Sequence, residues 1–241
     1  MSNLINVLDH GFARLVSYTQ PADHAGFEER TMDRDWTGDL EVVRNARVSY
    51  DADWREGDEQ KDAKLINYLM KNWHTSPFEA MTFTFEIKAP IFVIRQWHRH
   101  RTWAYNEVSA RYTELPEEFY VPAVEQITTQ SASNKQMRTA EQHPHADGWR
   151  EQIEEHCKRS FVLYKVMLEE GVPRELARGV LPMNTYTRMF ATVNLHNLFH
   201  FLRLRLHEHA QYEIRVYAEA LLKLIEQVCP EAVKAFKEHR L

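Results

Sequence analysis

Hydrophobic residues follow a two-residue period in only part of the chain, and that period predicts strands. Phe83, Phe85 and Ile87 alternate with polar residues, as expected of a strand with one buried face. Similar short runs of apolar and β-branched residues occur elsewhere and suit a sheet. We therefore expect three further strands, at residues 12–18, 43–50 and 108–115.

Helical spacing predominates in the rest of the chain. Leu65, Ile66 and Leu69 recur at intervals of three and four, which predicts an amphipathic helix. Pro90 stands where a first helical turn could begin, and Gly171 stands where a helix could end. The helices that we expect cover residues 61–72, 91–99, 150–170, 173–181, 188–207 and 211–228.

The arrangement of these segments favours one domain. Residues 125–149 contain few apolar side chains, so we expect an exposed polar excursion there. The chain has no internal repeat and no clean linker, and its 44% hydrophobic content is enough for a substantial core. We predict a single α+β domain over residues 1–241, in which an antiparallel-type sheet is flanked by helices.

Composition argues against several classes of function. None of the seven glycines falls in a GxGxxG or P-loop arrangement, which disfavours the standard phosphate cradles. Cys157 and Cys229 have neither metal-ligand spacing nor an activating pattern around them. No segment approaches the length of a membrane span, and no signal peptide is recognisable. We therefore expect a cytoplasmic protein with no membrane partner.

The chemistry concentrates in one run, RQWHRHRTWAYNEVSAR, which covers residues 95–111. It holds four arginines and two histidines against a single acid, Glu107, although the net charge of the chain is −5. Guanidinium groups can bind phosphate through two parallel hydrogen bonds. The run therefore predicts a focused pocket for an anionic, nitrogen-rich ligand, most simply a nucleotide, and not a broad nucleic-acid surface.

The same run carries a recognisable signature. Arg99, His100 and Arg101 are followed by Ser109 after seven intervening residues, with Asn106 and Glu107 in register. This pattern resembles the signature of the flavin-dependent thymidylate synthases, the ThyX family. The resemblance extends over residues 46–215, and further matching blocks lie at residues 46–50, 74–79, 177–205 and 209–215. The residues that depart from the usual family pattern are Ala80, Ala104, His196 and His200.

The resemblance implies a fold, a reaction and an assembly. The fold would be ThyX-like, with a mixed sheet and flanking helices. The enzyme would be a methyltransferase that makes dTMP from dUMP. 5,10-Methylenetetrahydrofolate would give the carbon, reduced FAD would give the hydride, and NADPH would re-reduce the FAD. The family is a homotetramer with sites shared between subunits.

The resemblance also implies roles for particular residues. The dUMP site would comprise Gln96, Trp97, His98, Arg99, Glu107, Val108, Ser109, Ala110, Arg111, Arg178 and Arg205. The FAD site would comprise Ser49, His74, Ser76, Arg99, His100, Arg101, Asn106, Glu107, Asn194, His196 and His200.

Arg205 would be the catalytic residue. Carbon 5 of uracil is a weak nucleophile, and a fixed guanidinium near the N3–C4–O4 edge would stabilise negative charge on the ring. One well-placed donor of this kind contributes about 3 kcal/mol. This strategy requires no cysteine nucleophile. For Ser109 we favour a hydrogen-bonding role over nucleophilic attack, because the local sequence supplies no adjacent base.

The late helix suggests that two sites lie on its two sides. At about 100° per residue, one face carries Asn194, Leu198, Phe201 and Arg205, and the other carries His196, His200, Arg203 and His207. We therefore expect each face to serve a different active site, which requires an oligomer. His196 and His200 alone do not make a metal site, because no third ligand accompanies them.

Two other functions remain open. One is a nucleotide-binding flavin reductase without folate-dependent turnover. The other is a nucleic-acid-binding protein that uses the Arg/His loop and its interleaved aromatic residues. The net acidity and the lack of a basic stripe elsewhere count against nucleic acid as a partner.

Overall fold

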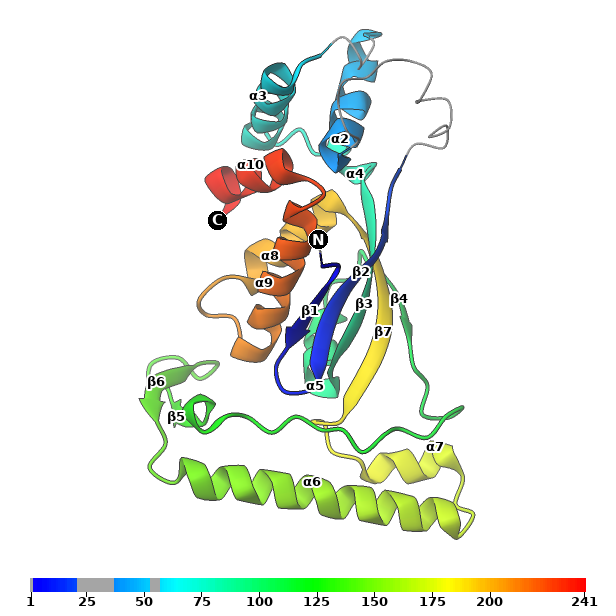
Figure 1. Cartoon of the computed structure of the whole chain (residues 1–241). Coiled ribbons are helices and arrows are strands. Elements are labelled where there is room, and N and C mark those ends of the chain that lie inside the picture. Colours follow the sequence, from blue (N-terminus) through cyan, green and yellow to red (C-terminus); the bar gives the residue numbers. More distant parts are fainter. Residues whose placement is uncertain (1, 21–36, 53–56) are drawn as a thin grey trace.

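A five-stranded antiparallel sheet forms the centre of the fold (Figure 1). The structure is a computed structural model that describes residues 2–20, 37–52 and 57–241. The order of the strands across the sheet is β1 (Leu4–Val7), β2 (Gly11–Tyr18), β3 (Thr82–Pro90), β7 (Tyr186–Asn194) and β4 (Ala104–Glu107). Each neighbouring pair is antiparallel. The α+β prediction and the strands expected at residues 12–18 and around Phe85 are confirmed.

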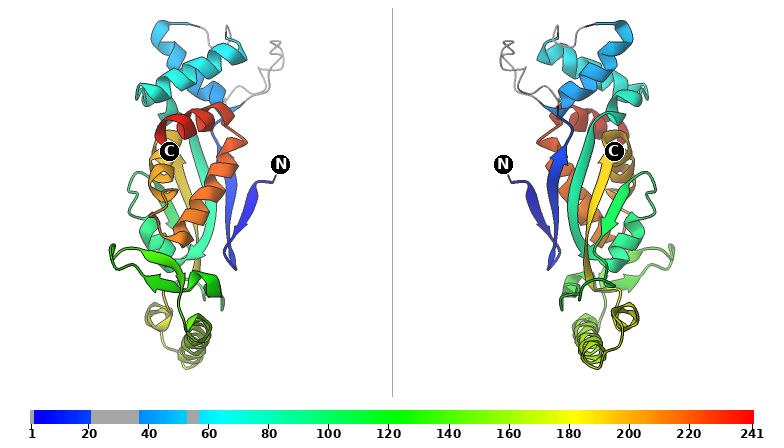
Figure 2. Two further views of the ribbon diagram at one scale, coloured as in Figure 1. Left: turned by 90° about the vertical axis from the view of Figure 1, so that its left-hand side faces the viewer. Right: turned by 90° about the vertical axis from the view of Figure 1, so that its right-hand side faces the viewer.

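Three helices pack against one face of this sheet: α5 (Ile91–Trp97), α8 (Leu195–Arg205) and α9 (Tyr212–Glu226) (Figures 1 and 2). Phe83, Phe85 and Ile87 are fully buried between the sheet and these helices, as their alternation predicts. The opposite face carries charged groups, including Glu86, which pairs with Arg14 at 3.1 Å and with Arg188 at 3.3 Å.

The remaining elements lie at the two ends of the sheet (Figure 1). One end carries α2 (Gly38–Arg47), the short helix η1 (Val48–Tyr50), α3 (Glu59–Lys71), α4 (Ser76–Glu79) and α10 (Pro230–Arg240). The other end carries α6 (Ala146–Glu169), α7 (Arg174–Ala177) and the short helix η4 (Arg178–Val180). A hairpin of β5 (Thr128–Gln130) and β6 (Arg138–Gln142), preceded by the short helix η3 (Val124–Gln126), precedes α6.

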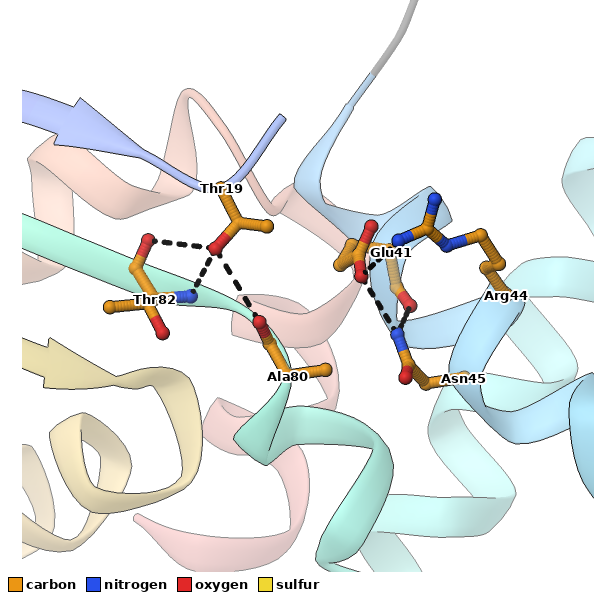
Figure 3. A network of polar contacts seen from close by, with 6 residues as sticks. All are labelled: Thr19, Glu41, Arg44, Asn45, Ala80 and Thr82. Carbon is orange, nitrogen blue, oxygen red and sulfur yellow. Dashed lines mark hydrogen bonds and ion pairs between the residues drawn. The ribbon is translucent and has the colours of Figure 1, made fainter. Parts of the chain in front are cut away.

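Side-chain hydrogen bonds connect distant parts of the chain at the α2 end. The two carboxylate oxygens of Asp39 accept from the backbone N–H groups of Glu231 and Ala232, each at 2.9 Å, and so cap α10. Figure 3 shows the Thr19 hydroxyl, which accepts from the Thr82 N–H at 2.9 Å and so holds the end of β2 beside β3.

A second cluster in Figure 3 lies within α2. Glu41 is only 3% exposed, and its carboxylate accepts from Arg44 at 2.7 Å and from Asn45 at 2.8 Å. These donors offset the unfavourable burial of its charge.

Three expected elements are wrong. Residues 43–50 are helical and not a strand, because Leu40, Val43 and Ala46 form one buried helical face. Residues 188–207 are not one helix: a strand occupies the first part, and α8 begins only at Leu195. Residues 108–115 form turns and loop, and the strand of that region lies earlier, at β4.

The other helical predictions are confirmed within a few residues at each end. They correspond to α3, α5, α6, α7 with η4, and α9. The polar excursion at residues 125–149 contains the β5–β6 hairpin, and its last residues already belong to α6. Strand β1 and helix α10 were not predicted from the pattern.

Candidate active site

The centre of the candidate site is a hydrogen bond between the end of α8 and the turn that follows α5. The Nε–H of Arg205 donates to Nε2 of His100 at 3.0 Å, and Nη2 of Arg205 donates to the carbonyl oxygen of Gln96 at 3.4 Å. Within the described part of the chain, Nη1 of Arg205 has no hydrogen-bond partner. The guanidinium is therefore fixed on two sides and retains donors for a ligand.

His100 accepts this bond as a neutral imidazole. It is 7% exposed, and burial, followed by the charge of Arg205 and the neighbouring His200, lowers its pKa to about 4. Because Nε2 is the acceptor, the proton of the neutral ring lies on Nδ1. Burial also lowers the pKa of Arg205, which nevertheless stays cationic at neutral pH.

Aromatic packing holds this pair in place. The ring of Phe201 on α8 lies 4.8 Å from the His100 ring and is stacked on Trp97 with 4.8 Å between ring centroids. The hydroxyl of Tyr105 on β4 donates to the carbonyl oxygens of His100 at 2.8 Å and Trp97 at 3.1 Å. Apolar residues at helical spacing on α8 thus bring Arg205 to the signature turn.

A pocket lies on the other side of α8 and adjoins this pair, because the ring centroids of His200 and His100 are 6.2 Å apart. Its lining includes His74, His196 and His200 together with Arg203, and apolar side chains of α3, α4, α8 and α10. Burial, followed by the nearby Arg203 and His196, lowers the pKa of His200. Imidazole rings beside a guanidinium and aromatic rings suit a planar, polar group with anionic substituents, so these residues fit a flavin nucleotide.

Sequence reasoning missed some residues of this pocket. Trp73 and Arg240 line it, and the Arg240 guanidinium lies 3.5 Å from the centroid of the Trp73 ring. Arg240 also donates to the carbonyl oxygen of Met70. Arg240 stands near the end of the chain, beyond the resemblance, and only the packing of α10 on α3 brings it here. Arg203 was recognised on the helix face but was not assigned to a site.

The nucleotide residues at the end of β4 form a third group. Glu107 accepts from the Thr187 hydroxyl at 2.8 Å, and the Val108 N–H donates to the carbonyl oxygen of Arg188 at 2.9 Å. Ser109 begins a turn, in which its hydroxyl accepts from the Arg111 N–H at 3.3 Å. No hydroxyl–base pair involving Ser109 occurs among the described residues, and its hydrogen-bonding role stays a prediction.

Arg111 and Arg178 connect this third group to the α7 end of the molecule. Arg111 lies 3.7 Å from Glu175 of α7, and both side chains are more than half exposed. Arg178 is exposed in η4, directly after α7. Within the described ranges, no hydrogen bond or ion pair joins either arginine to Arg99, His100 or Arg101. Direct polar contacts within the described residues of one chain thus do not join the expected dUMP residues into a single cluster.

The other expected site residues are distributed as follows. Ser49, Ser76, Arg99, Arg101 and Asn106 are exposed, and Asn194 caps α8 by accepting from the Asn197 N–H at 2.9 Å. Ala110 is buried, and His98 packs on Tyr105 with 4.7 Å between ring centroids. Trp97 is fully buried, so its indole packs in the core and is not exposed to a ligand.

The two faces of α8 differ as the helical spacing suggests. Leu198 and Phe201 are buried in the core, and Arg205 emerges from that face beside His100. His196, His200 and Arg203 on the other face line the pocket. The described residues contain no cluster of three or more potential metal-binding side chains. In the same part of the chain, no helix has the length and apolar character needed to cross a bilayer.

Comparison with known proteins identifies relatives. A family model described as thymidylate synthase complementing protein (Thy1) matches residues 32–231. The flavin-dependent thymidylate synthase of Treponema denticola is 45% identical, and the match covers 99% of this chain and 84% of the relative. That of Thermotoga neapolitana is 43% identical over 96% of this chain and 93% of the relative.

A solved structure is also similar. The UMP/dUMP methylase PolB from Streptomyces cacaoi, bound with 5-Br dUMP, is 31% identical and has a TM-score of 0.82, with 98% of each chain covered. The likeness extends over the whole fold, and the family expected from the signature is confirmed. The chain therefore belongs to the flavin-dependent thymidylate synthase family.

Proposed function

We propose that this protein is a flavin-dependent thymidylate synthase that converts dUMP to dTMP. Its relatives carry that name, and the similar solved structure is a methylase described with UMP and dUMP. The observation that carries the proposal is the Arg205 guanidinium, which is held by a neutral His100 and by the Gln96 carbonyl oxygen. 5,10-Methylenetetrahydrofolate is the proposed carbon donor, and NADPH the proposed reductant.

The role of Arg205 follows from its surroundings. His100 and the Gln96 carbonyl fix the guanidinium before a ligand arrives, so no reorganisation is needed when charge develops on the ring. Its remaining N–H donors would stabilise negative charge on the N3–C4–O4 edge of uracil. Because burial weakens solvent screening, each such hydrogen bond is stronger than in water. This activation uses no thiol, and both cysteines are buried.

The phosphate and sugar of dUMP would be held by the other cationic and polar groups. Arg99, Arg111 and Arg178 are exposed guanidinium groups that suit bidentate binding of phosphate. Glu107, Ser109 and Gln96 would accept or donate hydrogen bonds to the sugar and base. The buried Trp97 side chain would support these residues from the core without touching the nucleotide.

The flavin would occupy the pocket beside α8. His74, His196 and His200 line it, and Ser49, Ser76, His100, Arg101, Asn106, Glu107 and Asn194 are the further proposed contacts. When bound, the reduced flavin supplies the hydride that turns the transferred one-carbon unit into a methyl group. The cationic side chains at this pocket would favour binding of an anionic form.

We further propose that complete sites are assembled in a homotetramer. The expected residues lie in three groups of one chain: the pocket, the turn with Arg205, which adjoins the pocket through His100 and His200, and the segment from Glu107 to Arg111 with Arg178. Phe190 on β7 is 45% exposed on the face of the sheet that α5, α8 and α9 leave open, as expected of a surface that another subunit covers.

The experiment that tests the function combines a spectrum with turnover. Purified protein should show the visible absorbance of bound flavin. It should release tritium from 5-³H-dUMP only when both methylenetetrahydrofolate and NADPH are present. NADPH oxidation without folate-dependent tritium release would support the flavin reductase instead. Polynucleotide binding that weakens steeply with salt, in a protein without flavin, would support the nucleic-acid-binding alternative. Parallel assays with UMP would show whether the 2′-hydroxyl is tolerated.

A further inference from the structure

The side chain of Gln96 is the first member of a chain of hydrogen bonds that leads away from Arg205. Its Nε2 donates to Oε1 of Gln211, and Nε2 of Gln211 donates to Oε2 of Glu213 at 2.8 Å. The second oxygen of Glu213 accepts from Nη2 of Arg138 at 3.2 Å. These residues belong to α5, to the segment before α9, to α9 itself and to β6, so only the tertiary fold unites them.

Glu213 determines the direction of this chain. It is 3% exposed, and an ionised carboxylate can accept hydrogen bonds but cannot donate them. The NH2 group of Gln211 must therefore face Glu213, which leaves the Gln211 carbonyl oxygen toward Gln96. Gln96 must in turn present its NH2 group to Gln211. Its own Oε1 is then left as an acceptor, and it has no partner within the described residues.

Arg138 makes the burial of Glu213 possible. A buried carboxylate is strongly unfavourable unless a cation and hydrogen bonds compensate for it. Arg138 supplies the charge, and the hydroxyl of Tyr120 donates a further hydrogen bond at 3.3 Å. The Arg138 guanidinium is itself fixed by the Gln126 carbonyl oxygen at 2.9 Å and by the Tyr212 ring, whose centroid lies 5.6 Å away.

Gln96 also contacts the centre of the site. Its backbone carbonyl oxygen accepts from Arg205. Gln96 therefore helps to fix the guanidinium with its backbone, while the chain of hydrogen bonds orients its side chain. The β5–β6 hairpin, which the sequence predicts only as an exposed polar excursion, thus supplies the cation at the far end of this chain of hydrogen bonds.

We propose that Arg138, Glu213 and Gln211 are positioning residues. They orient the side-chain amide of Gln96 so that its Oε1 faces an N–H or O–H donor of the bound nucleotide. This inference rests on the proposed function, because it takes Gln96 to be a dUMP contact. An alternative role for Glu213 is purely structural, as an acid in the first turn of α9. The two roles differ in what a substitution changes.

The test is a double-mutant cycle on the flavin-loaded protein, with dUMP binding measured by calorimetry. Arg138→Gln should raise the Kd for dUMP about tenfold, the effect of losing roughly one charge-assisted hydrogen bond. Arg138→Lys, which keeps a cation beside Glu213, should recover most of the affinity. The matched control is Arg150→Gln, which breaks an ion pair with Glu154 on α6 and should leave the Kd unchanged.

The decisive comparison repeats these changes in a Gln96→Ala background. If Arg138 acts through Gln96, Arg138→Gln should have no further effect on the Kd there. Gln211→Ala breaks the link to Gln96 and keeps the ion pair of Arg138 and Glu213, so it gives the same test without separating the buried carboxylate from its cation. A thermal denaturation of every variant reports stability separately.

Each outcome has a distinct meaning. Equal effects of Arg138→Gln or Gln211→Ala on the Kd with and without Gln96 would overturn the positioning role. A lowered Tm with an unchanged Kd would also overturn it and would assign the residues a structural role. Failure of the unsubstituted protein to bind dUMP would overturn the proposed function itself.

Discussion

The Nε–H of Arg205 donates a hydrogen bond to Nε2 of His100 across 3.0 Å, although the two residues are 105 positions apart in the sequence. One residue ends α8 and the other follows α5, so their contact depends on the packing of both helices on the sheet. A neutral imidazole in this place orients the guanidinium without neutralising its positive charge. The signature histidine is therefore placed to support the arginine, in addition to any contact with flavin.

Replacing Arg205 by lysine should lower turnover about 100-fold, the magnitude expected when one preorganised donor is lost. Lysine carries a point charge and cannot bond His100 and the Gln96 carbonyl while directing another donor toward the substrate. The check is the kcat for tritium release, with Arg159→Lys on the exposed surface of α6 as the control. Unchanged turnover in Arg205→Lys would contradict the role assigned to the guanidinium.

His100 should make the protein less stable in acid. Its pKa in the folded state is about 4, below its ordinary value of 6.5, so the unfolded chain binds more protons between these pH values. Stability due to this group is therefore complete above pH 6.5 and falls as the pH decreases toward 4, by at most about 3 kcal/mol. In urea denaturation, the free energy of unfolding should fall less between pH 7.5 and 4.5 in His100→Gln than in the unsubstituted protein.

An NMR titration gives a direct check on His100. Its ring nitrogens should show a neutral imidazole with an unprotonated Nε2 at pH 6, and protonation only near pH 4. Protonation of His100 near pH 6.5 would contradict its assignment as a neutral hydrogen-bond acceptor.

Asp39 should have the opposite effect on stability. Burial raises its pKa from 3.8 to about 6, although two backbone N–H groups favour its ionised form. The folded state therefore holds the proton over a range where the unfolded state has lost it. Stability due to Asp39 decreases as the pH rises from about 4 to 6, by at most about 3 kcal/mol.

The measurement for Asp39 compares the protein with Asp39→Asn by urea denaturation at pH 4.5 and 7.5. The free energy of unfolding of the unsubstituted protein should fall, relative to that of the variant, between pH 4.5 and pH 7.5. A stability difference that does not change with pH would show that Asp39 titrates normally. Because His100 and Asp39 act in opposite directions over overlapping pH ranges, only such variant comparisons separate them.

Trp97→Phe should reduce stability and leave nucleotide affinity nearly unchanged. The indole is fully buried, stacked on Phe201 and in edge contact with Trp103 at 5.8 Å. The smaller ring leaves a cavity, and we expect a loss of about 2 kcal/mol in the free energy of unfolding. Denaturation and dUMP calorimetry on the same sample check this. A large increase in the Kd with little loss of stability would instead place the side chain at the nucleotide.

The sequence predicts the fold well where one period dominates. Phe83, Phe85 and Ile87 alternate without interruption, and β3 lies where they indicate. The sequence does not reveal β7, because Phe190 on its outer face lies between the buried residues Met189 and Ala191. Hydrophobic residues on both sides of that strand, continuing into α8, imitate a longer helix.

The candidate site is predictable only where local sequence encodes it. Arg99, His100 and Arg101 are recognisable from their spacing to Ser109. Contacts such as Arg240 over Trp73, or Arg138 beside Glu213, join segments whose own sequences carry no sign of each other. Only the packing of α10 on α3 and the placement of the hairpin beside α9 create them, so a single sequence could not reveal them.

Asn194 belongs to two elements at once, because its backbone pairs with Thr82 in the sheet while its side chain caps α8. The strand therefore passes into the helix without an intervening loop, and no hinge is available at that point. Thr187, which donates to Glu107, and Arg205, which donates to His100, therefore lie on one continuous strand–helix unit. Any movement that admits a ligand is therefore expected in segments other than this strand–helix junction.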